Sequence, residues 1–251
     1  MEAVRIIFFF ILGIEIGSFL NVVIDRLPAG QSLVRPPSHC PVCNTRLRAR
    51  DLIPVFSYLW LKGRCRYCAA PIPRRVFLVE LATGGAFAGL YAYYGLTAQF
   101  GLLAAYACLF LVIFVIDLDH QLILNKLTYP GAVFALATVP LWDDLSFPEA
   151  LIGGAVGFAL LFTVVVLSRG GMGWGDVKMA ALMGLALGFP IIFVGLFIGI
   201  VIGGLVAIAL LVTGKKGRKQ VIPFGPFLAV GAMTALLWGH ILWDWYTKPW
   251  A

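Results

Sequence analysis

The stretch from Met179 to Val212 reads MAALMGLALGFPIIFVGLFIGIVIGGLVAIALLV and contains no charged residue. It is too long for one helix across the hydrocarbon layer of a membrane, which needs about 20 residues. Its one proline lies in Gly188-Phe189-Pro190, and proline interrupts a helix because it lacks an amide donor and disfavours helix just before it. We therefore expect two apolar helices, over about 176–188 and 190–213, joined at this turn.

Apolar runs of similar length fill most of the remaining chain. Of its 251 residues, 61% are apolar and 12% are charged, whereas a soluble domain carries about a quarter charged residues. This composition predicts an all-α, polytopic integral membrane protein with about eight membrane helices, or seven if the sixth is partly re-entrant. The expected helices cover about 4–24, 75–95, 99–117, 126–142, 149–168, 176–188, 190–213 and 222–246. The expected division is a first transmembrane helix (1–24), a polar insert (25–74) and a membrane core (75–251).

Basic residues are distributed unevenly between the loops. Most of the 19 Lys and Arg residues fall in the insert and in loops 118–126, 169–178 and 214–220. These segments alternate along the chain, and cytoplasmic loops carry an excess of Lys and Arg. We therefore expect them to be cytoplasmic, with the N-terminus outside. Contact with anionic lipid accounts for the net charge of +7, so the expected partner is the lipid bilayer and no nucleic acid.

Two Cys-x-x-Cys pairs lie in the insert, as Cys40-Pro41-Val42-Cys43 and Cys65-Arg66-Tyr67-Cys68. Two such pairs are typical of zinc ribbons, in which four thiolates surround one Zn²⁺. The expected cytoplasmic location argues against disulfides, and a structural ion would supply folding energy. Segment 52–56 between the pairs could pack a very small core. Redox-active pairs, or His39 as a replacement ligand, are the alternatives.

Asp117 and Asp176 lie where apolar stretches meet short loops on the same expected side. A carboxylate at the edge of hydrocarbon is costly and is functional by default. A pair at one depth is suited to acid–base chemistry. Asp176 could instead be a helix N-cap, with Gly173 and Gly175 as turn formers. Asp119 is expected to face water.

The chain resembles the type IV prepilin peptidases, which are polytopic aspartyl proteases of the GxGD class. The resemblance runs over nearly the whole length and rests on Gly17-Ser18-Phe19-Leu20-Asn21-Val22-Val23-Ile24, Arg26-Leu27-Pro28, both cysteine pairs with Pro71-Ile72, Val79-Glu80-Leu81, Ile116-Asp117 with residues 118–125, Gly173-Trp174-Gly175-Asp176-Val177-Lys178 and Ile222-Pro223-Phe224-Gly225-Pro226-Phe227. It implies that Asp117 and Asp176 are the catalytic pair and that Gly173 and Gly175 support it. The chain departs from the family at Leu124, where the family commonly has proline. This departure bears on the shape of the loop after Asp117.

The resemblance also implies the substrates. They would be precursors of type IV pilins or type II secretion pseudopilins, cleaved at the cytoplasmic face of a bacterial inner membrane. Members with the cysteine-bearing insert are generally bifunctional and methylate the new N-terminus with S-adenosylmethionine. Gly63 and Glu80 are the candidates near that methyl donor, although Glu80 could instead pair with Arg74 or Arg75. The oligomeric state stays open.

Two alternatives belong to other classes of protein. One is a transporter or channel with a zinc-stabilised cytoplasmic module, which Glu15, Glu80 and the many glycines would suit. Inverted repeats are not evident, however, because only one clear helix break is found. The other is an assembly scaffold, against which the presence of both aspartates and both flanking glycines argues.

Overall fold

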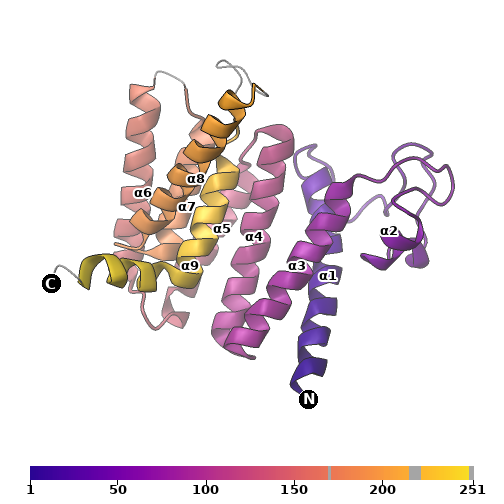
Figure 1. The fold of residues 1–251 in the computed structure, drawn as a ribbon, viewed down its shortest axis with the longest axis horizontal. Coiled ribbons are helices and arrows are strands. Elements are labelled where there is room, and N and C mark those ends of the chain that lie inside the picture. The colour runs from indigo at the N-terminus through magenta and orange to yellow at the C-terminus, as the bar shows by residue number, and fades with distance from the viewer. Residues whose placement is uncertain (169–170, 215–221, 249–251) are drawn as a thin grey trace. The chain divides into compact units, whose positions relative to one another are not determined.

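The computed structural model describes residues 1–168, 171–214 and 222–248. Figure 1 shows the elements in this part of the chain. They are α1 (Glu2–Arg26), the 3₁₀ helix η1 (Ala49–Asp51), α2 (Phe56–Trp60), α3 (Arg74–Tyr94), α4 (Ala98–His120), α5 (Asn125–Thr138), the 3₁₀ helix η2 (Val139–Leu141), α6 (Phe147–Leu167), α7 (Trp174–Leu187), α8 (Ile192–Val212) and α9 (Gly225–Thr247). No β-strand forms within these ranges, so the predicted all-α class is confirmed.

The basic residues of two predicted cytoplasmic loops fall partly outside the described residues. These are Arg169, Lys215, Lys216, Arg218 and Lys219. The structure therefore adds nothing to the part of the charge argument that depends on them.

A helix forms at each of the eight segments expected to cross the membrane. Six of these, in the part of the chain that the structure describes, are long and apolar enough to do so, namely α1, α3, α4, α6, α8 and α9. The other two, α5 and α7, have 14 residues each. At 1.5 Å per residue each reaches only about 21 Å, which is less than the roughly 30 Å of hydrocarbon. The predicted number of helices is thus roughly right, and two of them are shorter than a spanning helix.

The predicted break between the sixth and seventh apolar helices is confirmed. Helix α7 ends at Leu187, where Gly188 takes a φ of +72° that favours glycine, and α8 begins at Ile192. The amide of Phe189 donates a hydrogen bond to the carbonyl of Glu149 at 2.9 Å. This bond ties the turn to the first turns of α6.

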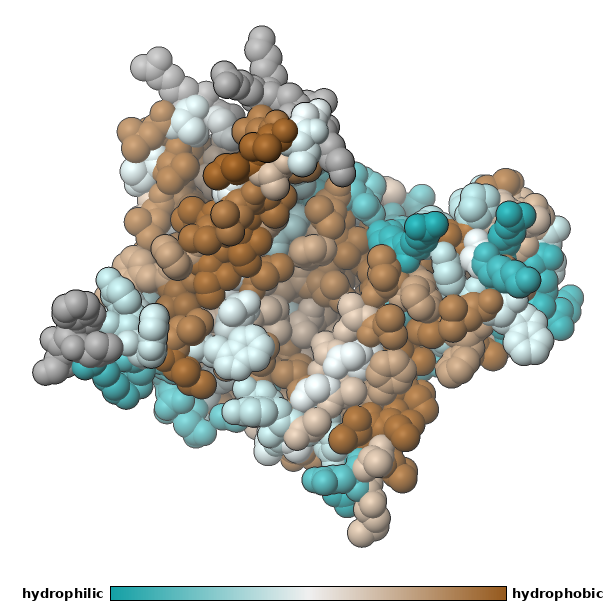
Figure 2. Space-filling view, in the orientation of Figure 1, coloured by the Kyte–Doolittle hydropathy of each residue, from teal (hydrophilic) through white to brown (hydrophobic). Residues whose placement is uncertain are grey.

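The outer faces of the long helices carry large apolar side chains, as expected of surfaces that face lipid. On α8, Phe197, Leu205 and Ile208 are all more than half exposed. Figure 2 shows the same pattern as a continuous brown surface over α8. A soluble protein rarely exposes so large an apolar surface, so the exposed faces support a multi-pass membrane protein.

The chain forms two compact units, Met1–Cys108 and Leu109–Ala251, and the division falls within α4. In the first unit, α1 packs against α3 at glycines. A Cβ added at Gly13 would lie 2.7 Å from the carbonyl oxygen of Thr83, and one at Gly17 would lie 2.8 Å from the Cα of Glu80. Small residues let helix backbones approach closely in lipid.

The insert between α1 and α3 does not pack the small core expected from segment 52–56. Leu52, Ile53 and Phe56 are 40%, 49% and 65% exposed, and only Pro54 of the segment is buried. That prediction is wrong because the insert has too few residues to cover these side chains.

In the second unit, α7 is the central helix and contacts α5, α6, α8 and α9. Val177, Met179, Ala180 and Met183 on it are fully buried. Its closest neighbour is α6, since a Cβ at Gly184 would lie 2.0 Å from the carbonyl oxygen of Gly153. The backbones of these two helices are therefore in direct contact.

We predict that Gly184→Ala destabilises the second unit by about 2 kcal/mol, because the added methyl group cannot fit without moving α6 or α7. Thermal unfolding of the detergent-purified protein would measure this. Gly204→Ala is the matched control, since nothing lies within 4 Å of a Cβ at that helical position. The control should keep or slightly raise the unfolding temperature. Equal unfolding temperatures for both variants would contradict the contact.

Candidate functional site

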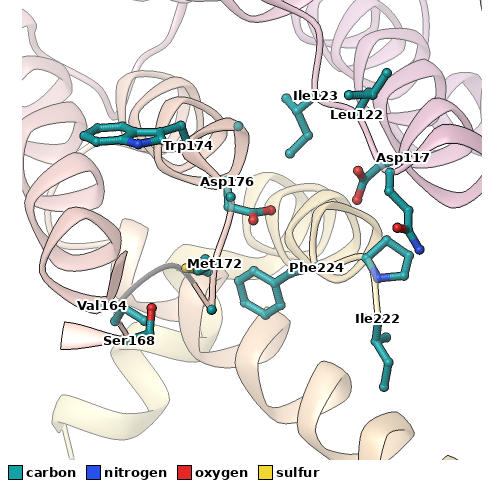
Figure 3. A pocket seen from close by; sticks show the side chains of 15 residues that line it. Asp117, Leu122, Ile123, Val164, Ser168, Met172, Trp174, Asp176, Ile222 and Phe224 are labelled. Atoms are coloured by element: carbon teal, nitrogen blue, oxygen red, sulfur yellow. The ribbon is translucent and has the colours of Figure 1, made fainter. Parts of the chain in front are cut away.

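A cavity of about 620 Å³ lies in the second unit. Its lining comes from the end of α4, the loop after it, the end of α6, the start of α7 with the residues just before it, and the segment just before α9. The residues are Asp117, Gln121, Leu122, Ile123, Val164, Ser168, Gly171, Met172, Gly173, Trp174, Gly175, Asp176, Ile222, Pro223 and Phe224. Figure 3 shows the carboxyl groups of Asp117 and Asp176 pointing toward one another across this space. The structure therefore brings together the two aspartates that the sequence singled out.

Asp117 lies in the last turn of α4 and is 5% exposed. Its Oδ2 accepts a hydrogen bond of 3.0 Å from the amide of Gly225. Gly225 is the first residue of α9, where helical amides have no acceptor within their own helix. The carboxylate thus satisfies a helix-terminal donor, and the donor fixes the orientation of the carboxyl group.

Gly225 is a site residue that the sequence analysis did not assign. A Cβ at this position would lie 2.6 Å from Oδ2 of Asp117, so every other residue would collide with the carboxyl group. The available signal was a glycine between Pro223 and Pro226 at the start of an apolar run. Segment 222–227 supported the family resemblance, but nothing in it pointed to Asp117.

Asp176 is the third residue of α7 and is 9% exposed. The helix begins at Trp174 with Gly173 as its N-cap residue, and no side chain caps it. The alternative in which Asp176 serves as N-cap is therefore wrong. The side chain faces the cavity instead, as Figure 3 shows.

The two flanking glycines make room around the pair. A Cβ at Gly173 would lie 3.4 Å from Oδ2 of Asp176, and one at Gly175 would lie 2.8 Å from the Cβ of Ile123. Gly175 therefore lets the loop after α4 lie directly against the start of α7. Leu124 in this loop has φ −78° and ψ 131°, values that proline also adopts. The departure from the family at Leu124 leaves the loop in a shape that proline would favour.

Lys178 links the start of α7 to the start of α5. Its Nζ donates a hydrogen bond of 2.8 Å to Oδ1 of Asn125 and lies 5.9 Å from the ring centre of Tyr129. This contact holds the two short helices together beside the cavity.

Two facing carboxyl groups can perform acid–base chemistry. Asp117 and Asp176 face each other across the cavity. Two carboxyl groups that lie close together cannot both ionise easily, and such a pair can share one proton. One member can then accept a proton while the other donates one, which is the arrangement used by aspartic proteases.

A second candidate site lies in the first unit, where the four cysteines of the insert converge. The Sγ atoms of Cys40, Cys43, Cys65 and Cys68 all lie within 4.8 Å of one another. Those of Cys40 and Cys68 are 3.8 Å apart. Four Zn–S bonds of about 2.3 Å in tetrahedral geometry place sulfurs about 3.8 Å apart. The cluster therefore fits a four-coordinate metal ion. His39 is not part of this described cluster, and its Nδ1 lies 3.1 Å from the carbonyl oxygen of Pro37.

The two cysteine pairs sit in loops of the same design. In each, the amide of the first cysteine donates to a carbonyl beyond the pair, and its own carbonyl accepts from a residue with positive φ. The bonds are Cys40 N to Thr45 O, Asn44 N to Cys40 O, Cys65 N to Ala70 O and Ala69 N to Cys65 O, with φ of 54° at Asn44 and 57° at Ala69. Two matching turns present their thiols to one centre, as the spacing predicted.

Local contacts prepare the insert for a cation. Hydrogen bonds from Thr45 lower the pKa of the Cys43 thiol to about 6. The amide of Ala70 favours the Cys68 thiolate, but burial and the neighbouring cysteines outweigh it and raise the pKa of Cys68 to about 12. Four thiolates this close together therefore need a cation between them.

Asp51 lies beside the second pair and accepts hydrogen bonds from Nε of Arg66 at 2.5 Å and from the hydroxyl of Tyr67 at 2.8 Å. Burial opposes ionisation of Asp51, but these donors outweigh it and hold its pKa at about 2. Asp51 therefore stays charged and holds the second turn in place.

Gly63 and Glu80 both lie where the insert meets α3. Glu80 is 4% exposed, and its Oε2 accepts a hydrogen bond of 2.7 Å from the amide of Val55. Arg75 forms an ion pair with Asp25, so the alternative pair of Glu80 with an arginine is not the contact that the structure shows.

Gly63 has φ +67°, and a Cβ there would lie 2.9 Å from the hydroxyl of Tyr58. The Tyr58 ring in turn stacks on Phe77 of α3, with centroids 5.2 Å apart. Both candidates are thus parts of one contact between the insert and α3.

A multi-pass membrane protein with facing carboxyl groups in one cavity has the architecture of a membrane-embedded aspartyl protease. Comparison with known proteins narrows this class. The model of the bacterial peptidase A24 N-terminal domain matches residues 11–94, and that of the type IV leader peptidase family matches residues 104–208. No solved structure matches the chain.

Curated relatives match nearly the whole chain. A prepilin leader peptidase/N-methyltransferase of Bacillus subtilis is 32% identical over 240 residues, covering 95% of this chain and 96% of that protein. The protein of the same description from Aeromonas hydrophila is 34% identical over 272 residues, covering 94% and 92%. That from Stutzerimonas stutzeri is 33% identical over 257 residues, covering 91% and 89%. The chain belongs to this family of leader peptidases.

Proposed function

We propose that this chain is a membrane endopeptidase that removes the basic leader from type IV prepilins or type II secretion pseudopilins. The observation that carries the proposal is the facing of Asp117 and Asp176 across one cavity. The names of the curated relatives, prepilin leader peptidase/N-methyltransferase, support the substrate class.

The proposed reaction needs no covalent intermediate. The ionised carboxyl group of the pair takes a proton from water as that water attacks the scissile carbonyl. The protonated carboxyl group donates to the carbonyl oxygen, which gives a tetrahedral gem-diol. The first carboxyl group then passes its new proton to the leaving nitrogen, and the second takes a proton back from a hydroxyl of the gem-diol as the carbon–nitrogen bond breaks, so the pair returns to its starting state. The amide of Gly225 positions Asp117, and Gly173 leaves space beside Asp176.

The site suits a substrate with an apolar helix and a polar leader. Ends of α4 and α6 and the start of α7 surround the cavity, so a substrate helix in the bilayer would present its polar end there. Apolar side chains such as Leu122, Ile123 and Phe224 line the cavity beside the aspartates. We place this end at the cytoplasmic face of the bacterial inner membrane, with the N-terminus outside, because the loops expected at this end are basic.

We predict that Asp117→Asn and Asp176→Asn each abolish cleavage of a prepilin-type substrate while the protein stays folded. Asparagine keeps the size of the side chain and removes the ionisable group. The measurement is leader release by detergent-purified protein, with unfolding temperature as the folding check. Asp119→Asn is the matched control, because Asp119 is exposed and does not line the cavity. Cleavage by either single variant would rule out the two-carboxylate mechanism.

A second prediction concerns the amide that positions Asp117. We expect Gly225→Ala to lower kcat/KM for leader cleavage by about 100-fold, because a displacement of the reacting group near 1 Å has that effect. Gly204→Ala should leave the rate unchanged, since it adds the same methyl group to a helix at an open position. A normal rate for Gly225→Ala would show that the hydrogen bond to Asp117 is dispensable.

The proposed ion of the cysteine cluster is a structural Zn²⁺. Four thiolates and no open position favour zinc in a structural role, and the sulfur spacing fits its tetrahedral geometry. In this proposal segment 25–74 is a metal-stabilised module and segment 75–251 is the peptidase core.

We predict about one zinc ion per purified chain, lost on Cys40→Ser or Cys65→Ser. Loss of the ion should expose the insert to limited proteolysis, because folding of such a module depends on metal binding. Elemental analysis and mapping of the cleavage sites would test this. Cys108→Ser is the control, since this cysteine lies in α4 outside the cluster. Zinc-free protein with an intact insert would contradict the proposal.

The second proposed activity is N-methylation of the new N-terminus with S-adenosylmethionine, which would supply the methyl group. The names of the relatives and the cysteine-bearing insert support it. Glu80 offers a buried carboxylate that can accept hydrogen bonds from an amine or hydroxyl. Gly63 offers backbone without a side chain. These two residues are the proposed contacts for the methyl donor.

We predict that Glu80→Gln lowers methyl transfer about tenfold and leaves leader cleavage unchanged, because it removes a charge-assisted hydrogen bond. Glutamine can still accept from the Val55 amide, so the insert should stay in place. Glu2→Gln is the control, since Glu2 is an exposed carboxylate at the start of α1. Mass spectrometry of the mature N-terminus separates the two activities. Equal methylation by both variants would remove Glu80 from the proposed site.

Family membership weighs against the alternatives of a transporter and a scaffold. Loss of cleavage in the aspartate variants would exclude the scaffold. Solute flux in proteoliposomes would be expected only of the transporter.

A further inference from the structure

The insert presents an apolar face on α2. Phe56, Leu59 and Trp60 are 65%, 58% and 84% exposed. Their spacing of three and four residues places them on one side of the helix. Leu52 and Ile53, just before α2, are also exposed. Apolar side chains grouped in this way mark a surface that contacts a partner or a membrane.

The contacts of α2 hold this apolar face beside α3, at the level of the first turns of α3. The amide of Val55 binds Glu80 at 2.7 Å, and Tyr58 stacks on Phe77. Glu80 lies six residues after the first residue of α3, or about 9 Å along the helix. Figure 1 shows α2 level with the upper parts of α1 and α3 and not beyond their ends. Because α3 is long and apolar enough to span a bilayer, this level corresponds to the boundary between headgroups and hydrocarbon.

The charge of the insert fits an anionic surface. Between the ends of α1 and α3 the basic residues outnumber the acidic ones, and the one acid of segment 27–73, Asp51, is paired with Arg66. The basic residues are Arg35, Arg46, Arg48, Arg50, Lys62, Arg64 and Arg66. Basic residues beside exposed Trp, Phe and Leu are the composition of helices that lie in the membrane interface.

We propose that Phe56, Leu59 and Trp60, with Leu52 and Ile53, form an interfacial anchor that docks the insert onto the anionic surface of the membrane that the chain spans. The side chains enter the boundary between headgroups and acyl chains, and the basic residues of the insert meet lipid phosphates. The anchor does not depend on the proposed peptidase activity.

Fluorine NMR of protein labelled with 5-fluorotryptophan, in nanodiscs that contain phosphatidylglycerol, tests the anchor. The chain has seven tryptophans, and loss of one resonance in Trp60→Phe assigns the signal of Trp60. A lipid with a nitroxide near its headgroup should broaden this signal, whereas a water-soluble gadolinium chelate should leave it sharp. The reverse pattern would overturn the proposal and show a face open to water, as a surface for another protein would be.

Matched variants separate the anchor from a general effect of lipid. Phe56→Gln combined with Leu59→Gln should reduce the nitroxide-induced broadening of the Trp60 signal at least twofold. Val34→Gln, an exposed apolar position of the insert outside α2 and the cysteine pairs, should not change it. Unchanged metal content in the variants shows that the insert is folded. Equal broadening in the double variant and the control would overturn the anchor.

Discussion

The direct backbone contact between α6 and α7 is the constraint on which the candidate active site depends. Gly153 and Gly184 allow it, because any side chain at either position would occupy the space of the other helix's backbone. Helix α7 can therefore be enclosed by four neighbours although it is only 14 residues long. Enclosure of α7 fixes the position of its first turn, and that turn carries Asp176.

At this end of the second unit, the buried carboxyl group of Asp117 receives a hydrogen bond from the backbone. A carboxyl group removed from water needs a hydrogen-bond donor or a proton. Asp117 obtains a donor from the first amide of α9, a group that itself has no acceptor within its helix. The structure thus pairs two groups that would each be costly alone, and no lysine or arginine is among the described residues that line the cavity. A lysine or arginine in this position would hold both carboxyl groups ionised and would remove the proton that acid–base chemistry requires.

Most of this arrangement could be predicted where the signal is local in sequence. Hydropathy located all eight helical segments, and the cost of a carboxylate at the membrane edge identified Asp117 and Asp176. The spacing of the cysteines predicted their cluster. The contact of Gly225 with Asp117 joins positions 108 residues apart, so no local pattern reports it. The partner of Glu80 was missed for a related reason, because a backbone amide such as that of Val55 has no side-chain signature.

The error over segment 52–56 is informative about the insert. An apolar stretch between two cysteine-bearing turns favours a small core, but a module of this size lacks the residues to enclose one. The cysteine cluster and Asp51 hold the turns together without it. The apolar side chains can then form an exposed surface. The Glu80–Val55 and Tyr58–Phe77 contacts hold that surface at the depth proposed for the lipid boundary. An insert that is fixed to α3 on one side would gain a second point of attachment from lipid. Two points of attachment restrict rotation of the insert about α3, whereas one point does not. An insert whose orientation is fixed in this way can hold Gly63 and Glu80 at a constant depth.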